Sequence, residues 1–149
     1  MGFYFKFQKL LEIEKLKEEG LVKELKLLQK QLQDDEKMLT LLQSVFTMQQ
    51  GEMEKELRKP QEANVFVLFE VYFAKLRRDM EAQGAKIKES AKKVALAREK
   101  LLVVFKRRKV LEKLRERQEK EYKEQMLRLE NKNYDEIATS RFQFKKIFK

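Results

Sequence analysis

The side chains that most often perform catalysis or bind metal are missing from this sequence. Its 149 residues include no Cys and no His, which excludes thiol nucleophiles, Ser-His-Asp triads, zinc fingers and HExxH metal sites. The four glycines are isolated from one another, so no Gly-rich loop is available for a phosphate group. We therefore predict no catalytic residue, no metal site and no cofactor, and we expect a protein that is not an enzyme.

Charged residues remain, and they are unevenly distributed. The chain has 35 Lys and Arg against 25 Asp and Glu, which gives a formal net charge of +10. Residues 1–59 are balanced, and the whole excess lies in residues 60–149. This asymmetry indicates an acidic partner, such as nucleic acid, an anionic membrane or an acidic protein surface, or else a solvated helix that is rich in Lys.

The charged residues must be positioned by long helices, because the composition contains almost no helix breakers. Pro60 is the only proline; it disfavours helix at Lys59 and suits the start of a new helix. We predict helix one over about 6–58, a turn at about 59–61, helix two over about 61–141 and a C-terminal tail over 142–149. Residues 1–149 would then form a single all-α domain, an antiparallel coiled-coil hairpin.

Heptad spacing supports the coiled coil. Positions spaced alternately four and three residues apart run from Leu21 to Met53 on helix one and from Phe69 to Leu129 on helix two. Several of them are polar, so we expect an imperfect seam. With the turn at 59–61, helix one ends opposite the region of residue 113, and about 20–25 residues of helix two would overhang the paired region.

Two regions carry more apolar surface than a two-helix seam requires. Val65–Phe69 and Val71–Phe73 spread around the helix after the turn, which predicts a protein contact, a third packing element or self-association. On the overhang, an apolar stripe runs through basic residues and indicates a groove, ring or membrane surface as its partner. The aromatic and basic end, residues 141–149, is either a flexible tail or a membrane contact.

Several stretches of the sequence resemble one known family. Residues 107–117 read RRKVLEKLRER and are followed by Glu121-Tyr122, by Asp135–Ala138 and by Arg141-Phe142. With FKFQKLL at residues 5–11 and YFAKL at residues 72–76, this succession is similar to the flagellar export protein FliJ family over the chain up to Phe142.

The resemblance implies a non-enzymatic coupling stalk of the flagellar type III protein export apparatus, similar to the central stalk of rotary ATPases. It implies that the joined ends enter the hexamer of the export ATPase FliI and that the hairpin contacts the export gate protein FlhA. The protein FliH and export chaperones are further implied partners. The expected location is cytoplasmic, peripheral to the inner membrane at the flagellar base, with no nucleic acid as partner.

The resemblance also implies two sets of contact residues. Those expected to bind the gate are Leu42, Val45, Tyr72, Leu76 and Gln83. Those expected to bind the ATPase ring are Phe7, Leu10, Leu111, Leu114, Arg115 and Tyr122.

Three alternatives stay open at the level of the sequence. One is the equivalent stalk of a virulence secretion system. Another is a basic coiled coil that binds nucleic acid by neutralising phosphates, although acidic residues interleave with the basic ones and no nucleic-acid-reading motif is present. The third is a peripheral membrane protein that uses its aromatic, basic ends.

Overall fold

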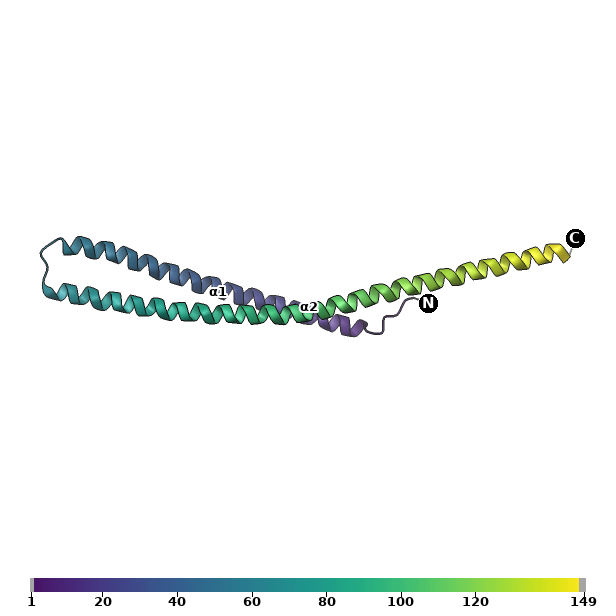
Figure 1. Cartoon of the computed structure of the whole chain (residues 1–149), viewed down its shortest axis with the longest axis horizontal. Coiled ribbons are helices and arrows are strands. Elements are labelled where there is room, and N and C mark those ends of the chain that lie inside the picture. The colour runs from purple at the N-terminus through teal and green to yellow at the C-terminus, as the bar shows by residue number, and fades with distance from the viewer. Residues whose placement is uncertain (1, 148–149) are drawn as a thin grey trace. The chain divides into compact units, whose positions relative to one another are not determined.

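Two helices account for almost all of the structure. The computed structural model describes residues 2–147, with the side chains of residues 2–146. Within that range the chain forms α1 (Gln8–Leu57, 50 residues) and α2 (Ala63–Ile147, 85 residues), and no strand (Figure 1). The predicted all-α class is confirmed, and the second helix is the longer one, as the position of Pro60 indicated.

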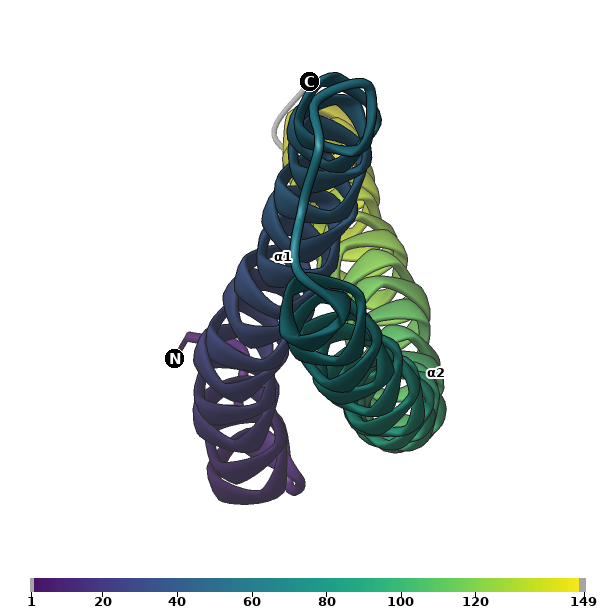
Figure 2. The ribbon, with the colours of Figure 1, turned by 90° about the vertical axis from the view of Figure 1, so that its left-hand side faces the viewer.

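The connection between the helices occupies residues 58–62 and lies nearest the viewer in Figure 2. The amide of Lys59 donates to the carbonyl of Glu56 (3.1 Å) and that of Val65 to the carbonyl of Glu62 (3.1 Å), closing one tight turn at each side of the connection. Pro60 lies between these turns, where its missing amide hydrogen is not needed. The connection therefore includes the predicted turn and is about one residue longer on each side.

The last helix ends later than the sequence suggested. α2 continues to Ile147, whereas helix two was expected to end near residue 141 and to be followed by a tail. A helix that packs through one face needs apolar residues at regular spacing, but an exposed helix needs only residues of adequate helix propensity. No Pro or Gly follows Gly84 in the sequence, so nothing interrupts the helix. The rest of the expected tail, Phe148 and Lys149, lies outside the described residues.

The structure divides into two compact units, each containing part of both helices. The turn unit comprises Glu19–Leu102 and includes the connection between α1 and α2. The terminal unit comprises the chain up to Glu18 together with the chain from Val103 onward.

The turn unit is held together by the predicted seam. Every heptad position predicted from Leu21 to Met53 on α1 and from Phe69 to Leu101 on α2 is buried or half-buried. Near the connection, the rings of Phe46 and Phe73 pack edge to face with centroids 5.1 Å apart. The heptad prediction is confirmed here because each helix has only one neighbour to cover its apolar stripe.

The terminal unit has a small core in which the segment before α1 takes part. Leu11 is fully buried, and Phe5, which precedes the helix, is 4% exposed. Phe3 lies against Tyr122 with ring centroids 5.8 Å apart. The paired region therefore reaches Tyr122 on α2, beyond the region of residue 113 that the sequence suggested. It does so because the non-helical residues that precede α1 continue the packing against α2.

Beyond Tyr122, α2 continues with its side chains exposed. Every side chain from residue 123 to residue 146 is exposed. The predicted overhang is therefore present as a continuous helix, and the heptad positions Gln125 and Leu129 on it are not buried.

Candidate functional site

A polar layer crosses the seam of the turn unit at Asp35, which is only 3% exposed. Its carboxylate accepts hydrogen bonds from the Ser90 hydroxyl (2.6 Å) and from the amide nitrogen of Gln31 (3.0 Å). The side-chain amide of Gln83 donates to the Asp35 backbone carbonyl (2.8 Å), and the Lys86 ammonium lies 3.6 Å from the carboxylate.

These contacts control the ionisation of Asp35. The hydrogen bond from Ser90 is the main cause that holds the pKa of Asp35 below its ordinary value; Gln31 and Lys86 add to it, and burial opposes it. The charged carboxylate is thus the form that the hairpin stabilises. Gln83, which we expected at the gate surface, is already engaged in this layer.

A second polar layer crosses the terminal unit at Arg108. Its guanidinium donates through Nε and Nη2 to the Glu18 carboxylate on α1, the Nη2 bond being 3.2 Å long, and through Nη1 to Glu112 (2.8 Å). The hydrogen bond from Arg108 is the main cause that lowers the pKa of Glu112, and hydrogen bonding to Glu18 is the main cause that raises the pKa of Arg108. Both layers fasten α1 to α2.

The residues expected at the gate contact have three different environments. Tyr72 is 39% exposed, and Leu42 and Val45 are half-buried. Leu76 is only 6% exposed and belongs to the seam. Since Leu76 and Gln83 are committed to interhelical packing, the accessible members of the set are Tyr72, Leu42 and Val45.

A shallow groove identifies further residues beside Tyr72. It has a volume of about 320 Å³, and Tyr72 lines it with Val65, Leu68, Phe69 and Gln49. Val45 lies four residues before Gln49 on α1 and so shares its face. We call Val45, Gln49, Leu68 and Tyr72 the turn patch. Leu68 and Gln49 were not in the expected set, although the excess of apolar residues after Pro60 was a signal for Leu68.

The terminal unit brings two of the expected ring-binding residues into one groove. Leu10 from α1 and Leu111 from α2 line a groove of about 370 Å³; its other lining residues are Glu14, Lys106, Arg107 and Val110. We call these six residues the terminal groove. It combines exposed apolar side chains with two basic residues at its rim, so it fits an apolar protein segment with acidic flanks.

The other four expected ring-binding residues lie outside that groove. Phe7 is 38% exposed and packs edge to face against Phe5, with ring centroids 5.9 Å apart. Leu114 and Arg115 are half-buried at the seam, where Arg115 Nε is buried without a hydrogen-bond partner among the described residues. Tyr122 is half-buried against Phe3.

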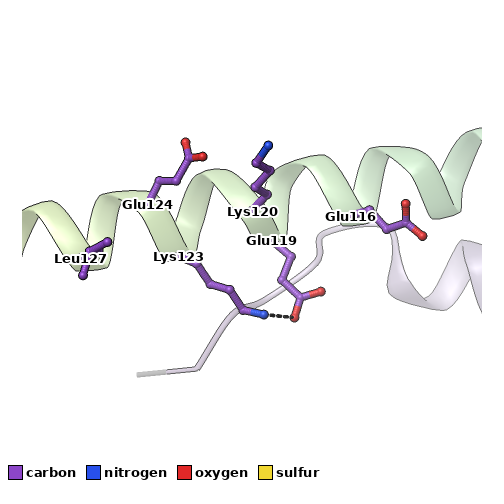
Figure 3. Close-up of a pocket in the computed structure, with 6 residues that line it drawn as sticks. All are labelled: Glu116, Glu119, Lys120, Lys123, Glu124 and Leu127. Carbon is purple, nitrogen blue, oxygen red and sulfur yellow. Dashed lines mark ion pairs between the residues drawn. The ribbon is translucent and has the colours of Figure 1, made fainter.

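The exposed part of α2 carries mainly solvated charges. A shallow depression of about 350 Å³ lies along α2, lined by the six residues that Figure 3 draws: Glu116, Glu119, Lys120, Lys123, Glu124 and Leu127. Lys123 Nζ lies 3.7 Å from Glu119 Oε1, and Arg117 Nε lies 3.9 Å from Glu121 Oε1. Such exposed pairs contribute little to stability, and they neutralise part of the basic charge that a nucleic acid would need.

Two kinds of feature are absent from the described part of the chain. Residues 2–147 contain no helix that is long and apolar enough to cross a membrane. The same residues contain no group of three acidic side chains placed to hold a metal ion.

Comparison with known proteins agrees with the sequence motifs. The family model described as "Flagellar FliJ protein" matches residues 3–146, which is nearly the whole chain. No curated protein and no solved structure matches the chain. The match includes both helices, the connection and the exposed end of α2. The chain therefore belongs to the flagellar FliJ family and is a component of the flagellar protein export apparatus.

Proposed function

We propose that this protein is a coupling stalk that links the hexameric export ATPase, FliI in the resemblance drawn above, to the export gate protein FlhA at the flagellar base. The observation that carries the proposal is the family match over residues 3–146. The match favours the flagellar stalk over the equivalent stalk of a virulence system. FliH and export chaperones are further candidate partners of the same surfaces.

The terminal unit offers the contact for the ATPase. A long helix with exposed side chains suits insertion into a ring, because a ring surrounds the helix and needs an accessible surface on every side. Residues 123–146 supply such a helix, and the terminal groove next to them supplies an apolar contact between basic side chains. We assign ring binding to this groove and to the helix that follows it.

The turn unit offers the contact for the gate. Tyr72 and Leu68 are exposed at the turn patch, and neither is needed for the seam. Exposed aromatic and aliphatic side chains around a groove are typical of the centre of a protein–protein interface. We assign gate binding to the turn patch, with Leu76 and Gln83 supporting it from within the hairpin.

Two pairs of variants test the assignment. Leu68→Ala with Tyr72→Ala should weaken binding to the gate at least about tenfold and leave ATPase binding unchanged, since interface centres lose about 1–2 kcal/mol or more per truncated anchor. Leu10→Ala with Val110→Ala should weaken binding to the ATPase at least about tenfold and leave gate binding unchanged. Val67→Ala and Leu16→Ala are matched controls, because both residues are exposed and line neither surface.

Binding is measured with purified partners by titration calorimetry, with circular dichroism to verify the helix content. If both double variants bind both partners like the wild type, the assignment of the two surfaces is wrong. If Leu68→Ala with Tyr72→Ala loses ATPase binding instead, the two ends of the chain have been assigned the wrong way round.

A further inference from the structure

A second groove lies on the other flank of the turn unit. It has a volume of about 550 Å³, with walls formed mainly by Met53 and Leu57 of α1 and by Phe66 and Phe69 of α2, and Glu70 and Arg77 beside them. Residues two positions apart on a helix point about 200° away from each other. Phe66 and Glu70 are each two positions from a turn-patch residue, Leu68 and Tyr72 respectively, so this groove faces away from the turn patch.

The groove exposes a large aromatic side chain that the hairpin does not cover. Phe66 is 50% exposed, and it borders the groove from the first turns of α2. Exposed aromatic side chains at an apolar groove are typical of interface centres. The proposed coupling function does not use this flank.

Glu70 and Arg77 carry opposite charges beside Phe66, but they are too far apart to pair with each other within one chain. Glu70 and Arg77 lie seven positions apart on the same face of α2, which is two helical turns or about 10 Å. That distance is too long for an ion pair within the helix. Neither residue forms an ion pair among residues 2–146; the Arg77 guanidinium lies over the Phe46 ring, 5.8 Å from its centroid.

We propose that this groove is a dimer interface, in which α2 of a second copy of the same chain packs antiparallel against α2. A two-fold axis between residues 73 and 74 places Glu70 of each copy opposite Arg77 of the other, so both ion pairs form at once. The same axis places each Phe66 over the helical turn of the other copy that follows Arg77. The spacing is self-complementary, which is the requirement of an isologous interface and is not needed by an unrelated partner.

Charge reversal tests the proposal with the full chain. Sedimentation equilibrium should show a concentration-dependent monomer–dimer equilibrium. Glu70→Arg and Arg77→Glu alone should each raise the dimer dissociation constant by about tenfold or more, because each places like charges together at two symmetric positions. The double variant Glu70→Arg with Arg77→Glu restores both pairs in the reverse sense and should return the dissociation constant toward that of the wild type.

Matched controls separate this effect from folding and from gate binding. Arg78→Glu changes the same charge one position away, on a face that does not line the groove, and should leave the dissociation constant unchanged. Phe66→Ala should weaken the dimer, whereas Val67→Ala next to it should not. Glu70→Arg should keep its affinity for the gate, because the turn patch lies on the opposite flank.

Three outcomes would overturn the proposal. The first is a wild-type chain that stays monomeric up to its solubility limit, which would leave the groove to a different protein. The second is a dimer that is insensitive to both single reversals. The third is a double reversal that fails to recover dimerisation while circular dichroism reports an intact helix content.

Discussion

Individual polar residues in the seam decide how α1 and α2 are joined. A buried carboxylate such as that of Asp35 is costly unless donors replace the water it loses. In the turn unit these donors come from Ser90, Gln31 and Lys86. In the terminal unit the Arg108 guanidinium donates to the Glu18 carboxylate. Polar layers of this kind specify which residues face each other across a coiled coil.

The Ser90 hydroxyl should make stability depend on pH in a defined direction. Asp35 has a lowered pKa in the folded chain, so its contribution to stability is present above the ordinary Asp value of about 3.9 and is lost as the pH falls through the folded value. Ser90→Ala removes the main cause of that shift. We expect Ser90→Ala to raise the pKa of Asp35 and to lower the melting temperature at pH 7.

Thermal unfolding followed by circular dichroism measures this effect, and the gap between Ser90→Ala and wild type should narrow as the pH is lowered below about 3.9. Ser44→Ala is the control, since the Ser44 hydroxyl bonds only the exposed carbonyl of Thr40. A gap that stays constant over the whole acid range would show that Ser90 acts through packing and not through the Asp35 carboxylate.

Two glycines inside α1 weaken the helix without a visible structural need. A Cβ added at Gly20 or Gly51 would meet no atom within 4 Å, and neither residue has a positive φ. Gly20→Ala and Gly51→Ala should each raise the free energy of unfolding by about 1 kcal/mol, because Ala loses less backbone entropy in a helix. Urea unfolding measures the change; a decrease at either position would contradict the open surroundings of that glycine in the folded chain.

At the scale of the helices, the sequence predicted the seam, because the seam depends on the heptad spacing of apolar residues. Heptad spacing identified the seam from Leu21 to Met53 and from Phe69 to Tyr122, because each helix buries a single stripe. It could not identify the pairing of Phe3 with Tyr122, which involves chain before α1 that has no helical period. The end of α2 at Ile147 was missed for a related reason, since an exposed helix leaves no periodic signal.

The exposed part of α2 should be separable from the packed part. Deleting residues 123–149 removes no buried side chain among those described, so the melting temperature should stay within about 2 °C of that of the full chain, while stimulation of the export ATPase should be lost. Deleting residues 118–149 also removes Tyr122, and with it the contact to Phe3, so that variant should melt at a lower temperature.

Circular dichroism melts and ATPase assays on the two truncated chains provide the comparison. Equal melting temperatures for both truncations would contradict the packing of the segment before α1. Full ATPase stimulation by the chain that lacks residues 123–149 would contradict the role assigned to the end of α2.

At the scale of the whole molecule, the family could be predicted from sequence, whereas the surroundings of the residues expected to bind partners could be predicted only in part. The RRKVLEKLRER motif and its neighbours identified the family because they are specific. Leu76 and Gln83 were predicted as contact residues from the resemblance to the family, and heptad position, which places both in the seam, describes their surroundings better. Leu10 and Leu111 line one groove, which could not be predicted from sequence because it depends on which faces of the two helices meet.

The difference between seam and surface has a measurable consequence at this scale. Leu76→Ala should lower the free energy of unfolding by about 2–5 kcal/mol, because a buried Leu leaves a cavity in the seam. Tyr72→Ala should change it by less than about 1 kcal/mol and weaken gate binding instead. Urea unfolding combined with gate-binding titration distinguishes the two, and the opposite ranking of stabilities would place Tyr72 in the core.

The most direct test of the coupling role is the turnover rate of the export ATPase, measured at fixed ATPase concentration while the purified chain is added. We predict that turnover rises to a plateau with the wild-type chain, rises equally with Leu68→Ala/Tyr72→Ala, and fails to rise with Leu10→Ala/Val110→Ala. A turnover rate that is unchanged by the wild-type chain would contradict the assignment of this protein as the stalk that couples the ATPase to the gate.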